Sequence, residues 1–249
     1  MVSSLDIPIR KSWGQNFIID KNTINKIVKI IDPQIDEEII EIGPGRGAIT
    51  MPLLDKVQSI VAIEIDPLLT QYLKDKNKSN LIVENIDFMD WSPSFKNKRR
   101  VIGNLPYYIS SPIIFKLIKD ERFNEIIIML QKELGIRMLA NEGNKDYSRM
   151  SVMAQTFCEI KYETDISKNI FNPKPNVDSC IISLKRKKSD LDFEKYSKYI
   201  RYAFQHKRKK IKNNLKNYIS QEGLEKFGER RAQDISVEEY IETFNKYFF

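Results

Sequence analysis

An amide, a proline and a phenol follow one another where an apolar strand is expected to end, at Asn104, Pro106 and Tyr107. Proline fits neither a helix interior nor the middle of a sheet, so the chain must leave a buried strand here. The Asn104 side chain and the Leu105 carbonyl can then accept two hydrogen bonds from an exocyclic amine, while the Tyr107 ring can stack on a flat heterocycle. Taken alone, the same residues fit a simple strand-exit turn equally well.

A glycine-rich turn lies earlier in the chain, between an expected strand and an expected helix. Gly43, Gly45 and Gly47 follow the apolar run 39–42, and residues 48–54 have a helical pattern. Strand, glycine turn and helix together open a nucleotide-binding α/β unit, because glycine lets a ligand approach the backbone. The G-x-G-x-G spacing differs from the G-x-G-x-x-G of dinucleotide-binding dehydrogenases, and a turn without any ligand stays open as the alternative.

Carboxylates follow two further apolar runs. Glu64 ends the run 60–63, about twenty residues after the glycine turn, where a carboxylate accepts both hydroxyl hydrogens of a ribose in doubly wound sheets. Asp87 comes shortly after the run 81–83, where it can accept a hydrogen bond from an adenine amino group. Ligand-type residues at three strand ends are hard to attribute to solvated loops, so we expect an adenosine-containing ligand along this edge.

The remaining pattern completes an α/β domain. The other expected elements are a helix capped by Asp20, a helix capped by Ser110 or Ser111, a strand over 125–130, a helix over 132–140, and strands over roughly 153–160 and 179–184. The strand over 125–130 is apolar after its first residue, as a strand covered on both faces should be. The two last strands could pair as an antiparallel edge.

A loop with two prolines, residues 171–178, lies between the two last strands and begins with Phe171. Prolines make such a loop stiff and extended. The loop is either a rigid connection or the support that holds Phe171 as a second ring against a target base, and the residues alone leave both interpretations open.

The bulk composition narrows the class of protein. The 249 residues include two cysteines and one histidine, which are too few for a disulfide framework and give little support to a zinc centre or a histidine relay. No apolar run approaches the roughly 18 residues of a membrane span, and the N-terminus lacks the apolar region of a signal peptide. We therefore expect a cytoplasmic protein that works without a metal ion and without a membrane.

The charge of the chain is basic and concentrated near the C-terminus. The formal net charge of +7 and the pI near 9.1 favour a polyanionic partner only weakly. A helix that opens at Tyr199 is expected to run into a basic stretch made of Lys207, Arg208, Lys209, Lys210 and Lys212. A charge run is often only a solvated helix face. Because the helices here are short and have few apolar positions, a small appended domain that presents cations to phosphates is the better interpretation.

In their order along the chain, these pieces resemble the KsgA/RsmA family of small-subunit rRNA adenine-N6 dimethyltransferases. The resemblance runs from about residue 11 to residue 215, and the combination is far more specific than any of its fragments. The matching segments are 14–17, 41–45, 63–64, 87, 104–107, 129–133, 147–152, 171–175 with 177–179, and the basic stretch 204–215.

The resemblance implies a class I S-adenosylmethionine-dependent methyltransferase fold, α/β with a Rossmann-like, seven-stranded and mostly parallel sheet. It implies a methyltransferase domain over 1–186 and a small all-helical RNA-binding domain over 187–249, with S-adenosyl-L-methionine as the cofactor. The residues implied in the cofactor site are Asn16, Ile18, Gly43, Gly45, Glu64, Ile65, Asp87, Phe88 and Asn104. The residues implied around the target adenine are Asn104, Leu105, Pro106, Tyr107 and Phe171.

The reaction implied by this family is methylation of two adjacent adenosines in a hairpin loop near the 3′ end of small-subunit (16S) rRNA, in a pre-30S particle during ribosome biogenesis, by an enzyme expected to be a monomer. Trp13, Ser148 and Lys174 depart from the residues that the family commonly carries, and the chain ends early for the bacterial family. These departures bear on RNA docking more than on the reaction.

Rival functions are an Erm-type methyltransferase of large-subunit rRNA and an assembly checkpoint that binds immature small subunits with methylation as a secondary activity. Leu105, where the Erm group commonly has isoleucine, and the loop that begins at Phe171 favour the small-subunit family. A small-molecule methyltransferase is disfavoured by the basic C-terminal stretch, and a DNA methyltransferase by the lack of a target-recognition domain.

Overall fold

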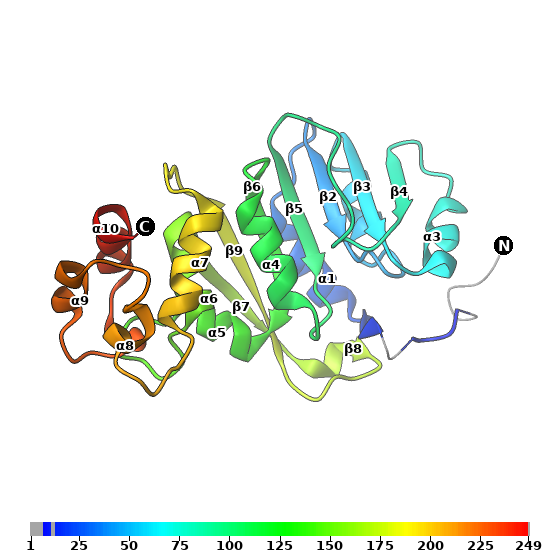
Figure 1. Ribbon diagram of the computed structural model, residues 1–249. Helices are drawn as coiled ribbons and strands as arrows, with labels where there is room; N and C mark the ends of the chain where they lie inside the picture. Colours follow the sequence, from blue (N-terminus) through cyan, green and yellow to red (C-terminus); the bar gives the residue numbers. More distant parts are fainter. Residues whose placement is uncertain (1–6, 11–12, 249) are drawn as a thin grey trace. The chain divides into compact units, whose positions relative to one another are not determined.

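The computed structural model describes residues 7–10 and 13–248, which fall into two compact units (Figure 1). Unit 1 comprises the described residues of 1–132 together with 162–185, and unit 2 comprises 133–161 and the described residues from 186 onward. The N-terminal stretch 1–6 and residue 11, where the family resemblance begins, lie outside the described residues.

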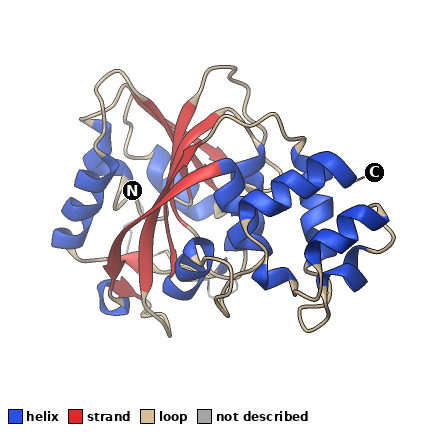
Figure 2. Ribbon diagram, turned by 90° about the vertical axis from the view of Figure 1, so that its left-hand side faces the viewer, coloured by secondary structure: helices blue, strands red, loops and turns tan. Residues whose placement is uncertain are grey.

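A mixed sheet forms the centre of the α/β architecture. Within the described residues it has seven strands in the order β4-β3-β2-β5-β6-β9-β7. Those strands are β2 (Glu38–Ile42), β3 (Ser59–Glu64), β4 (Leu81–Asn85), β5 (Arg99–Asn104), β6 (Phe123–Gln131), β7 (Cys158–Ile166) and β9 (Ser179–Arg186). The run from β4 to β6 is parallel, and β9 pairs antiparallel with β6. The predicted α/β fold with a mostly parallel sheet is confirmed, and Figure 2 shows the twist of its strands.

The strand order reverses between β2 and β5. From β2 the chain adds β3 and then β4 on one side, and it returns to place β5 and β6 on the other side. In an open parallel sheet, the crevice outside the carboxyl ends of the strands at such a reversal is where ligands bind. The glycine turn after β2 and the Asn104 corner after β5 therefore face the same crevice.

Helices cover both faces of the sheet in unit 1. The helices α1 (Lys21–Ile31), α2 (Thr50–Leu54) and α3 (Pro67–Lys74) contribute to one core cluster, while α4 (Ser110–Lys119) lies on the opposite face from α1 (Figure 1). Helix α1 begins as predicted, because the Asp20 carboxylate accepts a hydrogen bond from the Thr23 backbone N–H at 2.6 Å. The buried face of α1 carries Ile27, Val28 and Ile31.

A separate two-stranded pair closes one side of the crevice. Strand β1 (Phe17–Ile18) pairs antiparallel with β8 (Phe171–Asn172), which follows the short 3₁₀-helix η3 (Lys168–Ile170). Ile18 lies opposite Phe171 in this pair. The N-terminal segment is thereby attached to the loop that precedes β9.

Two local predictions, one of a strand and one of a helix cap, are wrong. The strand expected over 153–160 is instead helix α6 (Arg149–Phe157) followed by β7, because the residues from Met150 onward are buried nearly all round and carry no clear period. Neither Ser110 nor Ser111 caps α4: Ile109 holds the N-cap position without a side-chain bond, and the Ser110 hydroxyl donates to the Pro106 carbonyl at 2.8 Å.

Unit 2 is helical apart from its strand ends, with an aromatic core. After α5 (Lys132–Leu139) and α6 it contains α7 (Phe193–Ala203), α8 (Ile211–Leu215), α9 (Gln221–Phe227), the 3₁₀-helix η4 (Ala232–Asp234) and α10 (Val237–Tyr247). Tyr196, Tyr199 and Tyr240 are fully buried, and the Tyr240 hydroxyl donates to the Ala232 carbonyl at 2.6 Å. Aromatic side chains thus supply a large part of the core of this unit, together with buried aliphatic residues such as Val152, Ile200 and Leu215.

The basic stretch is not one helix with α7, as was expected. Helix α7 ends at Ala203, residues 204–210 form turns, and α8 begins at Ile211. The buried Asn214 side chain explains the break, because its amide donates to the carbonyls of Ala203 and His206 at 2.7 and 3.3 Å and so folds the chain back.

The predicted domain boundary after residue 186 stays a prediction. Unit 2 also takes in 133–161, because α6 packs against both α7 and α10. In the part of the chain that the structure describes, no helix is long and apolar enough to cross a bilayer.

Candidate active site

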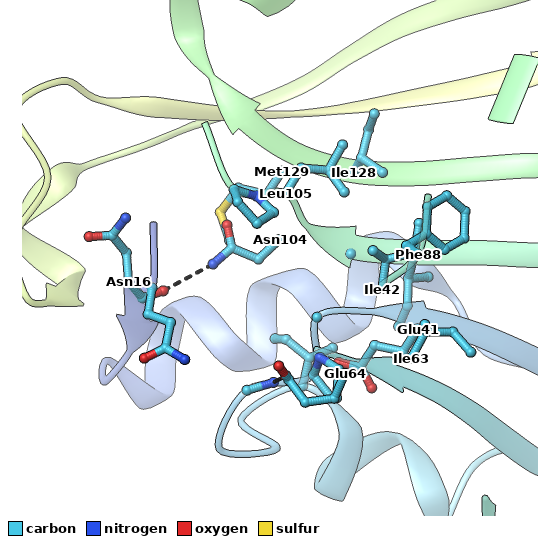
Figure 3. A pocket seen from close by; sticks show the side chains of 18 of the residues that line it. Asn16, Glu41, Ile42, Ile63, Glu64, Phe88, Asn104, Leu105, Ile128 and Met129 are labelled. Atoms are coloured by element: carbon cyan, nitrogen blue, oxygen red, sulfur yellow. Dashed lines mark hydrogen bonds between the residues drawn. The ribbon is translucent and has the colours of Figure 1, made fainter. Parts of the chain in front are cut away.

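A deep cavity lies in unit 1 at the carboxyl ends of the parallel strands. Its walls come from the segment before α1, the glycine turn after β2, the ends of β3 and β4, the Asn104 corner and the end of β6 (Figure 3). The predicted residues that line it are Asn16, Ile18, Gly43, Gly45, Glu64, Ile65, Asp87, Phe88, Asn104, Leu105, Pro106 and Tyr107. Segments far apart in sequence meet here because parallel strands bring their carboxyl ends to one edge.

Asn104 is the last residue of β5 and is held by a single directed contact. Its side-chain nitrogen donates to the Asn16 backbone carbonyl at 3.1 Å (Figure 3). Because an amide offers donors on nitrogen and an acceptor on oxygen, this bond leaves Oδ1 as the group available to a ligand. Gly103 allows the arrangement, since a Cβ at that position would lie 2.9 Å from the Ile42 carbonyl oxygen.

The corner after Asn104 is fixed on both sides. The Leu105 N–H donates to the Met129 carbonyl at 2.9 Å, which ties the corner to the end of β6. The Tyr107 hydroxyl lies 2.7 Å from the Ser179 hydroxyl, and burial raises the pKa of Tyr107, so the phenol stays neutral. The ring is half-buried and lines the cavity with its position set by β9.

The Glu64 carboxylate links the glycine turn to the start of α3. One carboxylate oxygen accepts from the Gly45 N–H at 3.1 Å, and the other accepts from the Asp66 N–H at 2.9 Å. Gly45 has a φ of +57°, and the Phe17 ring lies 3.1 Å from where its Cβ would be, so only glycine fits. Burial raises the pKa of Glu64 to about 7.

Glu41 is a second buried carboxyl group in the same cavity. Its side chain is 4% exposed, and within the described residues its Oε2 atom has no hydrogen-bond partner. Burial, with the nearby Glu64 charge adding to it, raises the pKa of Glu41 to about 7. An orphaned carboxylate oxygen in a cavity wall suits a cationic group, because a ligand cation would supply the missing partner.

Lys116 on α4 holds the loop that carries Asp87 and Phe88. The Lys116 ammonium donates to the carbonyls of Phe88, Met89 and Trp91 at 2.5–2.8 Å and lies 4.9 Å from the centre of the Phe88 ring. Burial lowers the pKa of Lys116. The Asp87 carboxylate accepts from the Met89 N–H at 2.8 Å, which sets its direction at the cavity edge.

The N-terminal segment is anchored by Asp66, which is completely buried at the start of α3. The Gln15 side-chain amide donates to Asp66 at 2.9 Å, and Arg10 forms an ion pair with the same carboxylate at 3.4 Å. Gln15 thus lines the cavity while its side chain is bonded to the protein.

Phe171 is absent from the cavity walls. Its ring is 3% exposed and belongs to the core cluster with Ile18, because β8 pairs with β1. Its predicted stacking on a target base stays a prediction.

The predicted RNA-binding cations lie in unit 2 and differ in their surroundings. Lys210 and Lys212 both pair with Glu229, so one of their two positive charges is compensated. Lys207, Arg208 and Lys209 are exposed in the turns before α8. Among the described residues, no group of three or more His, Cys, Asp or Glu side chains is arranged to hold a metal ion.

Comparison with known proteins decides the family. The model of the ribosomal RNA adenine dimethylase family matches residues 7–248. The chain belongs to this family. Ribosomal RNA small subunit methyltransferase A from Legionella pneumophila (strain Corby) is 41% identical over 248 residues, covering 94% of this chain and 95% of that relative. The protein of the same name from Mycoplasma mobile is 39% identical and covers 86% of each chain.

Solved structures agree with this family. A dimethyladenosine transferase from Plasmodium falciparum superposes with a TM-score of 0.82 at 26% identity, covering 94% of this chain and 100% of that chain. The 23S rRNA methyltransferase ErmE superposes with a TM-score of 0.71, also at 26% identity, covering 92% of this chain and 98% of that chain. The predicted class I methyltransferase fold is therefore confirmed. The chain is a methyltransferase that uses S-adenosylmethionine.

Sequence reasoning missed three residues that shape the site. The position of Glu41 inside an apolar strand is a usable signal of a ligand contact, because a carboxyl group is rarely buried without a partner. Asp66 was recognisable as an N-cap before Pro67, but its bonds to the N-terminal segment depend on folding. Nothing local marks Lys116, because its partners lie 25–28 residues earlier.

Proposed function

We propose that this chain transfers methyl groups from S-adenosylmethionine to the N6 atoms of two adjacent adenosines in a hairpin loop near the 3′ end of small-subunit rRNA. The substrate is a pre-30S particle in the cytoplasm, and the enzyme acts as a monomer. The observation that carries the proposal is the Asn104 corner, which presents an amide oxygen and an aromatic ring at the edge of an adenosine-type cavity.

The cavity residues fit the cofactor. Glu64 would accept the ribose hydroxyl hydrogens and Asp87 would accept from the adenine amino group. The Glu41 carboxylate, whose Oε2 has no partner among the described residues, would hold the cationic part of the molecule. When bound, S-adenosylmethionine supplies a methyl group that is already electrophilic because it is attached to a sulfonium. The protein therefore has to position a nucleophile rather than activate a donor.

Asn104 and Leu105 act on the exocyclic amine of the target adenine. That amine is a poor nucleophile because its lone pair is delocalised into the ring. Acceptance of its two hydrogens by Asn104 Oδ1 and by the Leu105 carbonyl favours the pyramidal nitrogen that develops in the transition state. No strong base is needed, and the proton leaves to water after transfer.

Tyr107 holds the target base. An adenine inside a stem cannot reach the cavity, so it must come from a loop or be flipped out of its stack. The half-buried Tyr107 ring, fixed by its bond to Ser179, offers a face on which the base stacks. Dimethylation further requires that the corner accept a nitrogen that already carries one methyl group.

A large-subunit rRNA target is the second candidate, since ErmE shares the fold over 92% of this chain. The small-subunit target is favoured because the relatives at 39–41% identity are named small subunit methyltransferases and because the dimethyladenosine transferase superposes more closely than ErmE.

Methyl transfer from labelled cofactor to unmethylated small and large ribosomal subunits tests the proposal. We expect label in small subunits, with the modified bases mapping to two neighbouring adenosines in one loop. Label confined to large subunits would refute the assignment. A variant that transfers no methyl groups but still binds immature small subunits would show that an assembly role coexists with catalysis.

A further inference from the structure

Unit 2 carries a cationic hollow that shares no residue with the active-site cavity. It is lined by Arg149, Glu194, Lys195, Ser197, Lys198 and Arg201. The positions 194, 197–198 and 201 recur every three to four residues on α7, so their side chains share one helix face. Arg149 is the first residue of α6, which packs on α7.

Arg149 is built into the hollow rather than free in solvent. Its guanidinium donates to the buried Ser197 hydroxyl at 2.9 Å. Arg149 and Arg201 line the same hollow, and burial together with repulsion from the charge of Arg201 lowers the pKa of Arg149. An anion placed between them would relieve that repulsion.

The exposed cations of the hollow are oriented by an aromatic pair. The Arg201 guanidinium carbon lies 5.6 Å from the centre of the Tyr202 ring, and the Lys198 ammonium lies 5.9 Å from it. Tyr202 in turn stacks on Tyr218, with ring centres 3.7 Å apart and planes 10° from parallel. Side chains that are already held in place lose less conformational entropy when they bind.

The charge of the hollow selects the ligand. Four of its lining residues are cationic and one, Glu194, is anionic, which gives 4 − 1 = +3. Arginine presents a planar fork of donors that fits phosphate oxygens in pairs, and half or more of protein hydrogen bonds to nucleic acids go to the backbone.

We propose that this hollow binds a backbone phosphate of the RNA substrate through Arg149, Lys198 and Arg201. The inference rests on the proposed function, since it takes the RNA of that reaction as the ligand. It adds a second anchoring point to the exposed cations Lys207, Arg208 and Lys209, so that α7 and the turns after it grip the RNA together.

The salt dependence of RNA binding tests this site. Affinity of the full chain for unmethylated small-subunit rRNA is measured over a range of salt concentrations for wild type, Lys198→Gln with Arg201→Gln, and Arg201→Lys. Lys74→Gln is the control for loss of one exposed charge away from the hollow, because Lys74 is exposed at the end of α3 that points away from the carboxyl edge of the sheet. Thermal unfolding checks that each variant folds, and cofactor affinity checks unit 1.

We expect the double variant to lose about one unit of the log–log salt slope, because loss of one phosphate contact removes roughly one. Its RNA affinity should fall about fivefold or more near physiological salt. Arg201→Lys keeps a charge and should keep the slope, and Lys74→Gln should match wild type. Unchanged slope and affinity in the double variant, with wild type still methylating small subunits, would overturn this inference alone. Failure of wild type to bind or methylate small-subunit rRNA would overturn it together with the proposed function.

Discussion

Asn104 and Asn16 are joined by a hydrogen bond of 3.1 Å from the Asn104 side-chain nitrogen to the Asn16 backbone carbonyl. The bond connects the end of β5 to the residue before β1, two segments 88 positions apart in sequence. Because the nitrogen is occupied, the amide cannot rotate to present its donors to the cavity, and Oδ1 stays directed there as an acceptor. The N-terminal segment therefore positions the amide on which the proposed reaction depends.

Tyr107 should contribute through its ring and not through its hydroxyl. Tyr107→Ala removes the stacking face, which is worth about 1–3 kcal/mol, so we expect kcat/KM for RNA to fall roughly tenfold to a hundredfold. Tyr107→Phe keeps the ring and loses only the bond to Ser179, and it should stay within a few-fold of wild type. Cofactor affinity, measured by calorimetry, should be the same in both variants. Equal losses in the two variants would show that the hydroxyl matters instead.

Glu41 should make the cofactor-free protein less stable as pH rises. The pKa of Glu41 is raised to about 7 in the folded chain, well above its ordinary value, so folding favours the protonated form. This contribution is complete below the ordinary pKa and is lost as pH rises through about 7. Glu41→Gln cannot ionise and does not lose this contribution. The Tm of the variant, measured relative to that of wild type, should therefore rise as pH goes from acid to alkaline, by about 2–4 °C for each kcal/mol involved.

Thermal unfolding of wild type and Glu41→Gln between about pH 5 and pH 8 measures this difference, because Glu64 and the other carboxyl groups titrate in both proteins. Parallel Tm curves for the two proteins would contradict the assigned pKa.

Lys116 should hold the cofactor loop without touching the cofactor. Lys116→Met leaves three loop carbonyls without their charged donor, at a cost of about 1–3 kcal/mol, and frees the loop that carries Asp87. We expect the Kd for S-adenosylmethionine to rise about tenfold. Lys119→Met, on an exposed position of the same helix, is the matched control and should bind like wild type. A normal Kd in Lys116→Met would show that the loop holds its shape without this contact.

The sequence predicted those parts of the site that depend on local pattern and on one topological rule. Glu64, Asp87 and Asn104 each follow an apolar run, and the parallel sheet brings such ends together. Helix α6 was missed because its residues are buried nearly all round, and a fully buried helix shows no amphipathic period.

The features that the sequence did not predict depend on contacts between segments far apart in the chain. Phe171 lies in the core because β8 pairs with β1, a pairing of short segments that no sequence pattern marks. The basic stretch breaks after α7 because the Asn214 amide captures the Ala203 carbonyl from 11 residues away. Lys116 and Asp66 likewise act on partners that become neighbours only after folding.

Single-turnover methyl transfer by Asn104→Ala tests the central claim, which is that the Asn104 amide oxygen accepts the target amine beside the methyl donor. Wild type and variant are compared on unmethylated small-subunit rRNA at saturating cofactor, with cofactor affinity measured in parallel. We predict that transfer falls by about 100- to 1,000-fold, as for loss of one transition-state hydrogen bond, while the cofactor Kd changes far less. Transfer at a rate near that of wild type would contradict the account.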